Sequence, residues 1–499
     1  IYVPAEPSEH VQQATLELAT SLASVYRATG VDVRVLPLEE GETQPSSVPE
    51  QRERQIVISG SGNPGMRLMN PGQDDLYLHI TGEDTGIADQ ARLMTDSLLP
   101  LAADDQVETL GFGDIPDVST EVATLRELGN YALESESLAR TQVFITVERS
   151  QLRPFVESFD LRLTGSYTPL PDSQAGQISV RVGDDVVDFF TADDTGIIDR
   201  TFTIPSDLIG RYTDIVVEYR TTGDIGCGTT QPVGLQINGE SMVFTVHTDV
   251  PMLSGFLALP QAFQPAVDVT LAGDNVENLA RAVRIMVGVQ SLSSERIRPQ
   301  VVSWDEAVDS PRSTLFVDPA GELSHEVPLY ISEEGTKFTV VHAEDGGGVK
   351  GKDLLGSVEA EEEPEIISEE LGYFYQLRTR DKLEAGALQA VWDEKGKRMI
   401  LVASSNNHVD QLDGLLDWLE AEPSRWGGIQ GDLLARVDGR TPVDLAVSHS
   451  PIQPQQRSGF WIALSLAGLV IAVAVVISRV VARRTRKKAQ GSTQQPEGK

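Results

Sequence analysis

The spacing of hydrophobic positions changes along the chain, and each change predicts a different kind of structure. Up to about residue 140, short apolar runs such as 55–59 and 76–80 alternate with stretches of helical spacing such as 8–30. Strands that alternate with helices indicate a mostly parallel sheet that helices cover on both faces. Residues 1–140 are therefore predicted to form an α/β domain.

From residue 141 to 252 the spacing is that of strands. Short alternating or β-rich segments follow one another about every ten residues, and turn residues such as Gly183 and Asn238 separate them. This pattern predicts an antiparallel β-sandwich of the jelly-roll kind. Helical and strand spacing alternate again from residue 253 to 450, which predicts a second α/β domain.

The end of the chain has the pattern of a membrane span. Residues 459–478 carry no charge, and twenty helical residues cover the ~30 Å hydrocarbon core of a bilayer. Six cations follow: Arg479, Arg483, Arg484, Arg486, Lys487 and Lys488. The positive-inside rule keeps such cations in the cytoplasm. The sequence thus predicts a linker at 451–458, a transmembrane helix at 459–478 and a basic cytoplasmic anchor at 479–499.

Composition refines the expected location. Cys227 is the one cysteine, which excludes an intrachain disulfide and fits a bacterial envelope better than a eukaryotic secreted scaffold. We expect a single-pass protein of the bacterial plasma membrane, with its large N-terminal part outside and its C-terminus in the cytoplasm. The chain begins at Ile1 rather than Met, so we expect an N-terminus that is processed or truncated.

The net charge of −35 limits the partners of the outer part. Such an excess of carboxylates repels nucleic acid and anionic lipid, and it suits neutral or cationic partners.

Catalytic patterns are missing from the sequence. The Gly60-Ser61-Gly62 turn lacks the spacing of a nucleophile elbow, and neither a P-loop nor a zinc-binding motif occurs. The aspartates between residues 184 and 194 fit either a calcium site or ordinary turns, and Cys227 fits either a reactive thiol or a packed side chain. We therefore expect no enzyme activity, no catalytic residue, no resident metal and no cofactor.

Sugar binding is the chemistry that the predicted sandwich can offer. Carbohydrate sites need aromatic faces for stacking and polar groups for the hydroxyls. Adjacent Phe189 and Phe190 must point to opposite faces of a strand, so one of them belongs to the core. The candidate carbohydrate contacts are Tyr167, Phe190 and Tyr212.

The order of segments and several local phrases resemble the BcsB-like family of bacterial cellulose synthase components, whose members are usually labelled cyclic di-GMP-binding regulatory proteins. The phrases are LQINGES at 235–241, FLALP at 256–260 with VDVTL at 267–271, and LVASS at 401–405 followed by GDLL at 431–434. The family pattern alternates two jelly rolls with two flavodoxin-like domains, and the first jelly roll would precede residue 1. The resemblance implies a mixed fold in which two flavodoxin-like α/β domains flank a jelly roll, with a C-terminal transmembrane helix.

The resemblance also implies a function. The chain would be a non-catalytic, membrane-anchored component of a cellulose or related polysaccharide synthase that guides the emerging glucan. Its partners would be the glucan polymer, the membrane and a processive membrane glycosyltransferase. From the net charge we expect no nucleic acid partner, and despite the family label we expect no cyclic di-GMP site on this chain. The residues expected to dock the transmembrane helix are Trp461, Ala463, Ser465, Gly468 and Ala472. The alternative is a stand-alone surface carbohydrate-binding protein or adhesin without a synthase.

Overall fold

A computed structural model describes most of the chain up to residue 446. The described part omits residues 40, 97–98, 100–103, 112–120, 153–154, 172–173, 224–231, 250, 252, 322–326, 328–336, 342–373, 379–383, 406–407 and 438. We call residues 121–248 the sandwich, and the described residues before 112 and after 252 the body.

The first part of the body is a six-stranded sheet in the order β2-β1-β3-β5-β4-β6. The strands β2, β1, β3 and β5 run parallel, whereas β4 pairs antiparallel with both β5 and β6. The bounds are β1 Tyr2–Val3, α1 Glu9–Val25, β2 Leu36–Pro37, β3 Gln55–Ser59, β4 Gly65–Met69, β5 Tyr77–Thr81, α2 Gly86–Leu93 and β6 Gln106–Val107.

The second part of the body is a seven-stranded sheet in the order β18-β17-β19-β23-β22-β24-β25. Its first four strands are parallel and its last three pairings are antiparallel, so the sheet is mixed. The strands are β17 Ala266–Leu271, β18 Arg298–Val301, β19 Thr314–Asp318, β22 Ala385–Asp393, β23 Arg398–Ser405, β24 Leu433–Val437 and β25 Val443–Leu445. The remaining elements are η4 Gly255–Ala258, η5 Gln261–Phe263, α3 Val276–Gln290, α4 Trp304–Asp309, α6 Val409–Glu420, α7 Ser424–Gly428 and the separate pair β20 Lys337–Val341 and β21 Phe374–Arg378.

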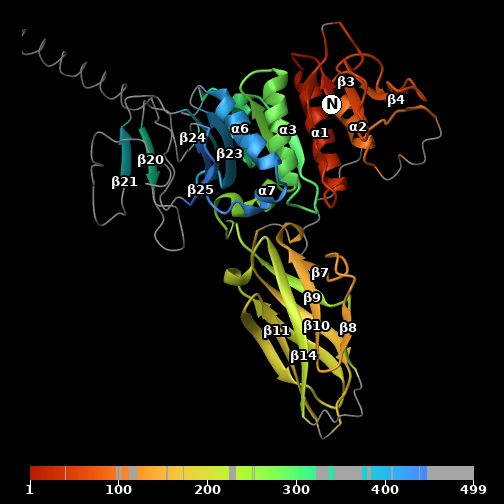
Figure 1. The fold of residues 1–499 in the computed structure, drawn as a ribbon, viewed down its shortest axis with the longest axis vertical. Helices are drawn as coiled ribbons and strands as arrows, with labels where there is room; N and C mark the ends of the chain where they lie inside the picture. Colours follow the sequence, from red (N-terminus) through yellow and green to blue (C-terminus); the bar gives the residue numbers. More distant parts are fainter. Residues whose placement is uncertain are drawn as a thin grey trace, which may run out of the picture. The chain divides into compact units, whose positions relative to one another are not determined.

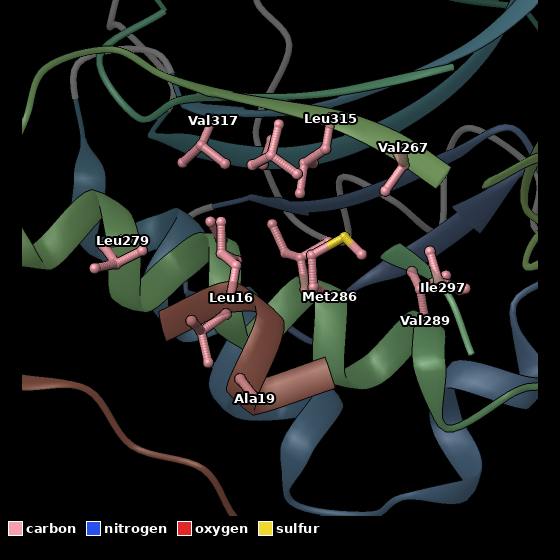
Figure 2. Packing of buried hydrophobic residues seen from close by; sticks show 14 of the residues in the cluster. Leu16, Ala19, Val267, Leu279, Met286, Val289, Ile297, Leu315 and Val317 are labelled. Atoms are coloured by element: carbon pink, nitrogen blue, oxygen red, sulfur yellow. The ribbon is translucent and has the colours of Figure 1, made fainter. Parts of the chain in front are cut away.

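The two parts of the body share one hydrophobic core. Helix α1 packs along α3, and Figure 2 shows Leu16 and Ala19 of α1 among buried side chains of α3 and the second sheet. The Gln13 side chain of α1 donates to the Pro299 carbonyl at 2.8 Å and accepts from the Val301 amide at 2.7 Å. The N-terminal helix is therefore as much a part of the second sheet's core as of the first.

The sandwich has its own core. One sheet has the order β7-β16-β10-β15-β8 with β13 beside β10, and the other has the order β12-β11-β14-β9 (Figure 1). Alternate residues of both sheets are buried between them, and that cluster runs from Ala123 to Val243. The elements are β7 Val122–Thr124, β8 Glu134–Ser137, β9 Arg140–Glu148, η2 Arg149–Gln151, β10 Val156–Tyr167, β11 Gln174–Val182, β12 Asp185–Thr191, β13 Ile197–Ile204, η3 Ser206–Leu208, β14 Tyr212–Gly223, β15 Val233–Ile237 and β16 Met242–His247.

Two buried arginines attach the sandwich to the body. The Arg211 guanidinium donates to the carbonyls of Leu259, Phe256 and Gly427 at 3.0, 2.9 and 2.9 Å. Arg149 donates to the Gln261 side chain at 2.9 Å, and burial lowers the pKa of Arg149 to about 10. Arginine suits such a contact because its planar donors can satisfy several carbonyls at once.

These observations correct the predicted fold class. The described chain is mostly β-sheet with few helices, and the α/β regions are not two flavodoxin-like domains, because α1 and α3 join both sheets in one core. Hydrophobic spacing reports that a strand is buried, but it does not report which distant segment buries it.

The predicted location is also corrected. Among the described helices, none combines the length and the apolar character that a membrane crossing needs, so the prediction of a single-pass plasma-membrane protein is wrong for the described chain. Residues 459–478 lie outside the described residues. The same holds for Trp461, Ala463, Ser465, Gly468 and Ala472, and for Arg479, Arg483, Arg484, Arg486, Lys487 and Lys488.

Candidate functional site

The outer surface of the four-stranded sheet combines exposed aromatic rings with hydrogen-bonding side chains. We call this surface, formed by the outward residues of β12, β11, β14 and β9, the aromatic face. Phe144 of β9 and Phe189 of β12 are each 64% exposed. Phe144 lies between buried Val143 and Ile145, so the alternation of the strand turns its ring outward.

The strand register fixes what lies between the two rings. One row across the sheet is Gln142, Glu218, Ser179 and Phe189, and the next row is Phe144, Val216, Arg181 and Val186. Neighbouring strands lie about 4.8 Å apart, so the two edge strands are roughly 14 Å from each other. Each ring thus stands on an edge strand of this face, and Glu218, Ser179 and Arg181 lie on the two central strands.

Glu218 organises the centre of the aromatic face. Its Oε2 accepts hydrogen bonds from Arg140 at 2.6 Å, Gln142 at 2.8 Å and Arg181 at 3.4 Å. Burial alone would raise the pKa of Glu218, but hydrogen bonds from Arg140 and Gln142 and the charges of Arg140 and Arg181 hold the pKa below its ordinary value. The carboxylate therefore stays ionised and keeps its neighbours in place.

The structure separates the three predicted sugar contacts. Tyr167 is 5% exposed, and its hydroxyl donates to Asp193 at 2.8 Å, so its ring has no free face. Phe190 packs against the sandwich core with the Arg200 guanidinium 5.1 Å from its ring centroid. Tyr212 is 41% exposed at the start of β14, and its hydroxyl donates to the Leu292 carbonyl at 2.8 Å. The three rings do not form one site.

Sequence reasoning did not single out Phe144, and it chose Phe190, which packs against the sandwich core, rather than exposed Phe189. It recognised that one of the two adjacent rings must face the core, but the sequence around them does not say which one. The signal that could have found Phe144 is its place among alternating Val143, Ile145 and Val147, which mark the buried side of the strand.

A polar hollow of about 540 Å³ lies on the other sheet of the sandwich. Its lining includes Glu134, Glu136, Thr168, Gly234 and Gln236. Tyr167 supplies the aromatic ring of the lining, and that ring is buried. The hollow thus lacks the stacking surface that the aromatic face provides.

A serine–histidine contact occurs in the body. Ser59 Oγ and His79 Nε2 are 2.8 Å apart, and burial lowers the pKa of His79. Among the described residues no carboxylate hydrogen-bonds or forms an ion pair with His79, so the pair lacks the third member of a catalytic triad.

The structure bears on the alternative of a calcium site, but not on the alternative of a reactive thiol at Cys227. Within the described ranges no group of three or more His, Cys, Asp or Glu side chains could hold a metal ion. Asp188 pairs with Arg200 and Asp193 accepts from Tyr167 and Thr195, so both have structural partners. Cys227 lies outside the described residues.

Comparisons with known proteins give only distant likenesses. No family model matches the chain, and no curated protein matches it. The VP2 subviral particle of infectious bursal disease virus is 14% identical over 25% of this chain and 32% of that chain, with a TM-score of 0.17. The CBM36-1 domain of a xylanase from the Trinervitermes trinervoides hindgut metagenome is 11% identical over 23% of this chain and 77% of that chain, with a TM-score of 0.14.

A third likeness is the CBM22-1-GH10 part of xylanase 10B from Clostridium thermocellum. It is 9% identical over 40% of this chain and 45% of that chain, with a TM-score of 0.14. The chain thus spans less than half of the viral and clostridial chains. Likenesses with such TM-scores carry no argument about the function of this protein.

Proposed function

We propose that this protein is a non-catalytic polysaccharide-binding protein that holds an extended glycan across the aromatic face. The observation that carries the proposal is the pair of exposed rings, Phe144 and Phe189, on opposite edge strands, with Glu218 and Ser179 on the two strands between them.

The chemistry of a sugar ring matches this arrangement. A pyranose has apolar C–H faces that stack on aromatic rings, and hydroxyls around its edge that exchange hydrogen bonds with amides, hydroxyls and carboxylates. A protein interface usually has its aromatic residues gathered in a buried centre. Here the rings stand apart, and the polar groups lie between them, which favours a long flat polymer over a protein partner.

The resemblance suggests the setting for such binding. We propose that the glycan is the product of a processive glycosyltransferase with which this protein associates, so that the aromatic face receives the emerging polymer. Binding on an open surface with two rings is expected to be weak, which allows a moving polymer to leave as easily as it arrives. Co-purification of a glycosyltransferase from the native host would support the association, and recovery of the protein alone would favour a stand-alone carbohydrate-binding protein.

Affinity electrophoresis with soluble β-glucans, followed by calorimetric titration with oligosaccharides, tests the binding itself. Phe144→Ala and Phe189→Ala should each reduce affinity roughly tenfold, because a stacked ring contributes about 1–1.5 kcal/mol. Ile197→Ala is the matched control, since Ile197 is 65% exposed on the other sheet of the same sandwich. Equal affinity of all three variants and the parent protein would refute the proposed face.

A further inference from the structure

Arginines gather on the aromatic face of a protein that is otherwise strongly acidic. The whole chain has 75 acidic and 40 basic residues. On the aromatic face, Arg140, Arg181 and Arg220 surround one central carboxylate, that of Glu218. The local charge is therefore opposite in sign to the charge of the whole molecule.

The register places two of these arginines directly opposite each other. Arg220 of β14 faces Arg140 of β9 on one side and Gln177 of β11 on the other. Like charges that face each other across a strand pair are destabilising. Arg140 is compensated by Glu218 at 2.6 Å, whereas no carboxylate of the described chain forms an ion pair with exposed Arg220.

Apart from Glu218, the carboxylates on this face lie toward the other end of the sheet. Asp214 is six residues before Arg220 on β14 and accepts a hydrogen bond from Thr146 at 2.7 Å. The Asp184-Asp185 turn follows Val182, which pairs with Ile215 near the same end. The aromatic face thus has an end with excess positive charge, where Arg140 and Arg220 lie.

We infer that the glycan bound by the aromatic face is anionic, a polysaccharide that carries carboxylate groups such as those of uronic acids. This inference rests on the proposed function and specifies its substrate class. Guanidinium groups bind carboxylates through paired, charge-assisted hydrogen bonds, and Arg220 is placed to make them. One carboxylate per sugar is a lower charge density than that of nucleic acid, which the net charge of −35 repels more strongly.

A matched pair of ligands tests the inference in calorimetric titrations of the full chain. Cellohexaose and its C6-carboxylated counterpart, an oligoglucuronate hexamer, differ only in the groups that the arginines would bind. We expect the carboxylated hexamer to bind roughly tenfold more tightly at low salt, and to lose this advantage between about 20 and 200 mM NaCl.

Arginine variants distinguish binding of the carboxylate groups from contacts that any sugar ring would make. Arg220→Gln should reduce the affinity for the carboxylated hexamer by roughly fivefold to tenfold and leave cellohexaose binding unchanged, because the ion pairs that hold Glu218 in the described structure come from Arg140 and Arg181. Arg220→Lys should retain part of the affinity. Arg162→Gln is the control, since Arg162 pairs with Asp199 on the other sheet of the sandwich.

Each other outcome overturns the inference in a recognisable way. Equal binding of both hexamers, unaffected by Arg220→Gln, refutes an anionic substrate and leaves the proposed function standing. Binding of neither hexamer refutes both. Tighter, Arg220-dependent binding of a single-stranded oligonucleotide of equal charge would indicate that the ligand is nucleic acid rather than a polysaccharide.

Discussion

The sandwich and the body differ in how the chain builds their cores. The sandwich core comes from one continuous stretch, residues 121–248. The body core comes from two stretches that more than 140 residues separate, and α1 and α3 bring them together. In sequence the sandwich is thus an insertion within the body, and continuity of the chain is a poor guide to which segments fold together.

This difference predicts how the unfolding of each region responds to substitutions in its core. Because both halves of the body share one core, they should unfold in one transition, whereas the sandwich can unfold in another. Tryptophan fluorescence separates the two: Trp304, Trp392, Trp418 and Trp426 lie in the body, and the sandwich contains no tryptophan. Far-UV circular dichroism reports both.

The largest expected effect comes from Leu16→Ala. Leu16 is fully buried on α1 among residues of the second sheet and α3, and removing such a side chain costs roughly 3–5 kcal/mol through lost burial and a cavity. The fluorescence transition in a urea titration should shift to lower urea although every described tryptophan lies beyond residue 300. Leu161→Ala, equally buried in the sandwich, is the control and should shift mainly the dichroism. An unchanged fluorescence midpoint for Leu16→Ala would mean that the body halves are separate domains.

Arg211→Met should have the next largest effect, at the junction. The change removes the donors to three carbonyls of the body and leaves them without their buried partner, at a cost of about 2–3 kcal/mol. The fluorescence and dichroism transitions should then move further apart, because the sandwich no longer stabilises the body. Arg220→Met, on the exposed part of the same strand, should leave both midpoints in place.

The smallest expected effect is a pH dependence of stability that arises from His79 in the body. Burial lowers the pKa of His79 below its ordinary value, so the unfolded chain binds a proton at a higher pH than the folded chain does. The stabilisation that neutral His79 contributes is fully present above the ordinary histidine pKa. It is lost as the pH falls from that value through the lowered pKa of His79 in the folded protein. His79→Gln should therefore reduce the loss of thermal midpoint between about pH 7 and pH 5. His247→Gln in the sandwich is the control, and an equal reduction from both variants would contradict this assignment.

The sequence predicts many of the strands but not their assembly. Segments such as 177–182 and 399–403 follow alternating or continuous apolar patterns, and they lie in β11 and β23. Nothing in those patterns indicates that α1 will bond to β18 through Gln13, because that contact joins residues nearly 290 positions apart. Periodicity measures local burial, and tertiary pairing decides the fold class.

The sequence predicts the kind of site that we propose, but not its residues. The sequence favours sugar-contacting aromatics on the sandwich, but buried Tyr167 and inward Phe190 show that an aromatic residue near a turn is often a core residue. The arginine cluster was not predictable, because Arg140, Arg181 and Arg220 come together only through the register of three strands. The net charge of −35 instead indicated an acidic surface.

Strand β14 has a mechanical consequence for the proposed binding. Just before its first residue, Arg211 attaches the chain to the body, and near its other end Arg220 lies on the aromatic face. A pull on a glycan held at Arg220 would load β14 along its length, so that its hydrogen bonds to β9 and β11 would resist in shear and would have to break together rather than one after another. The strand that presents Arg220 would thus also transmit tension from a growing polymer to the body.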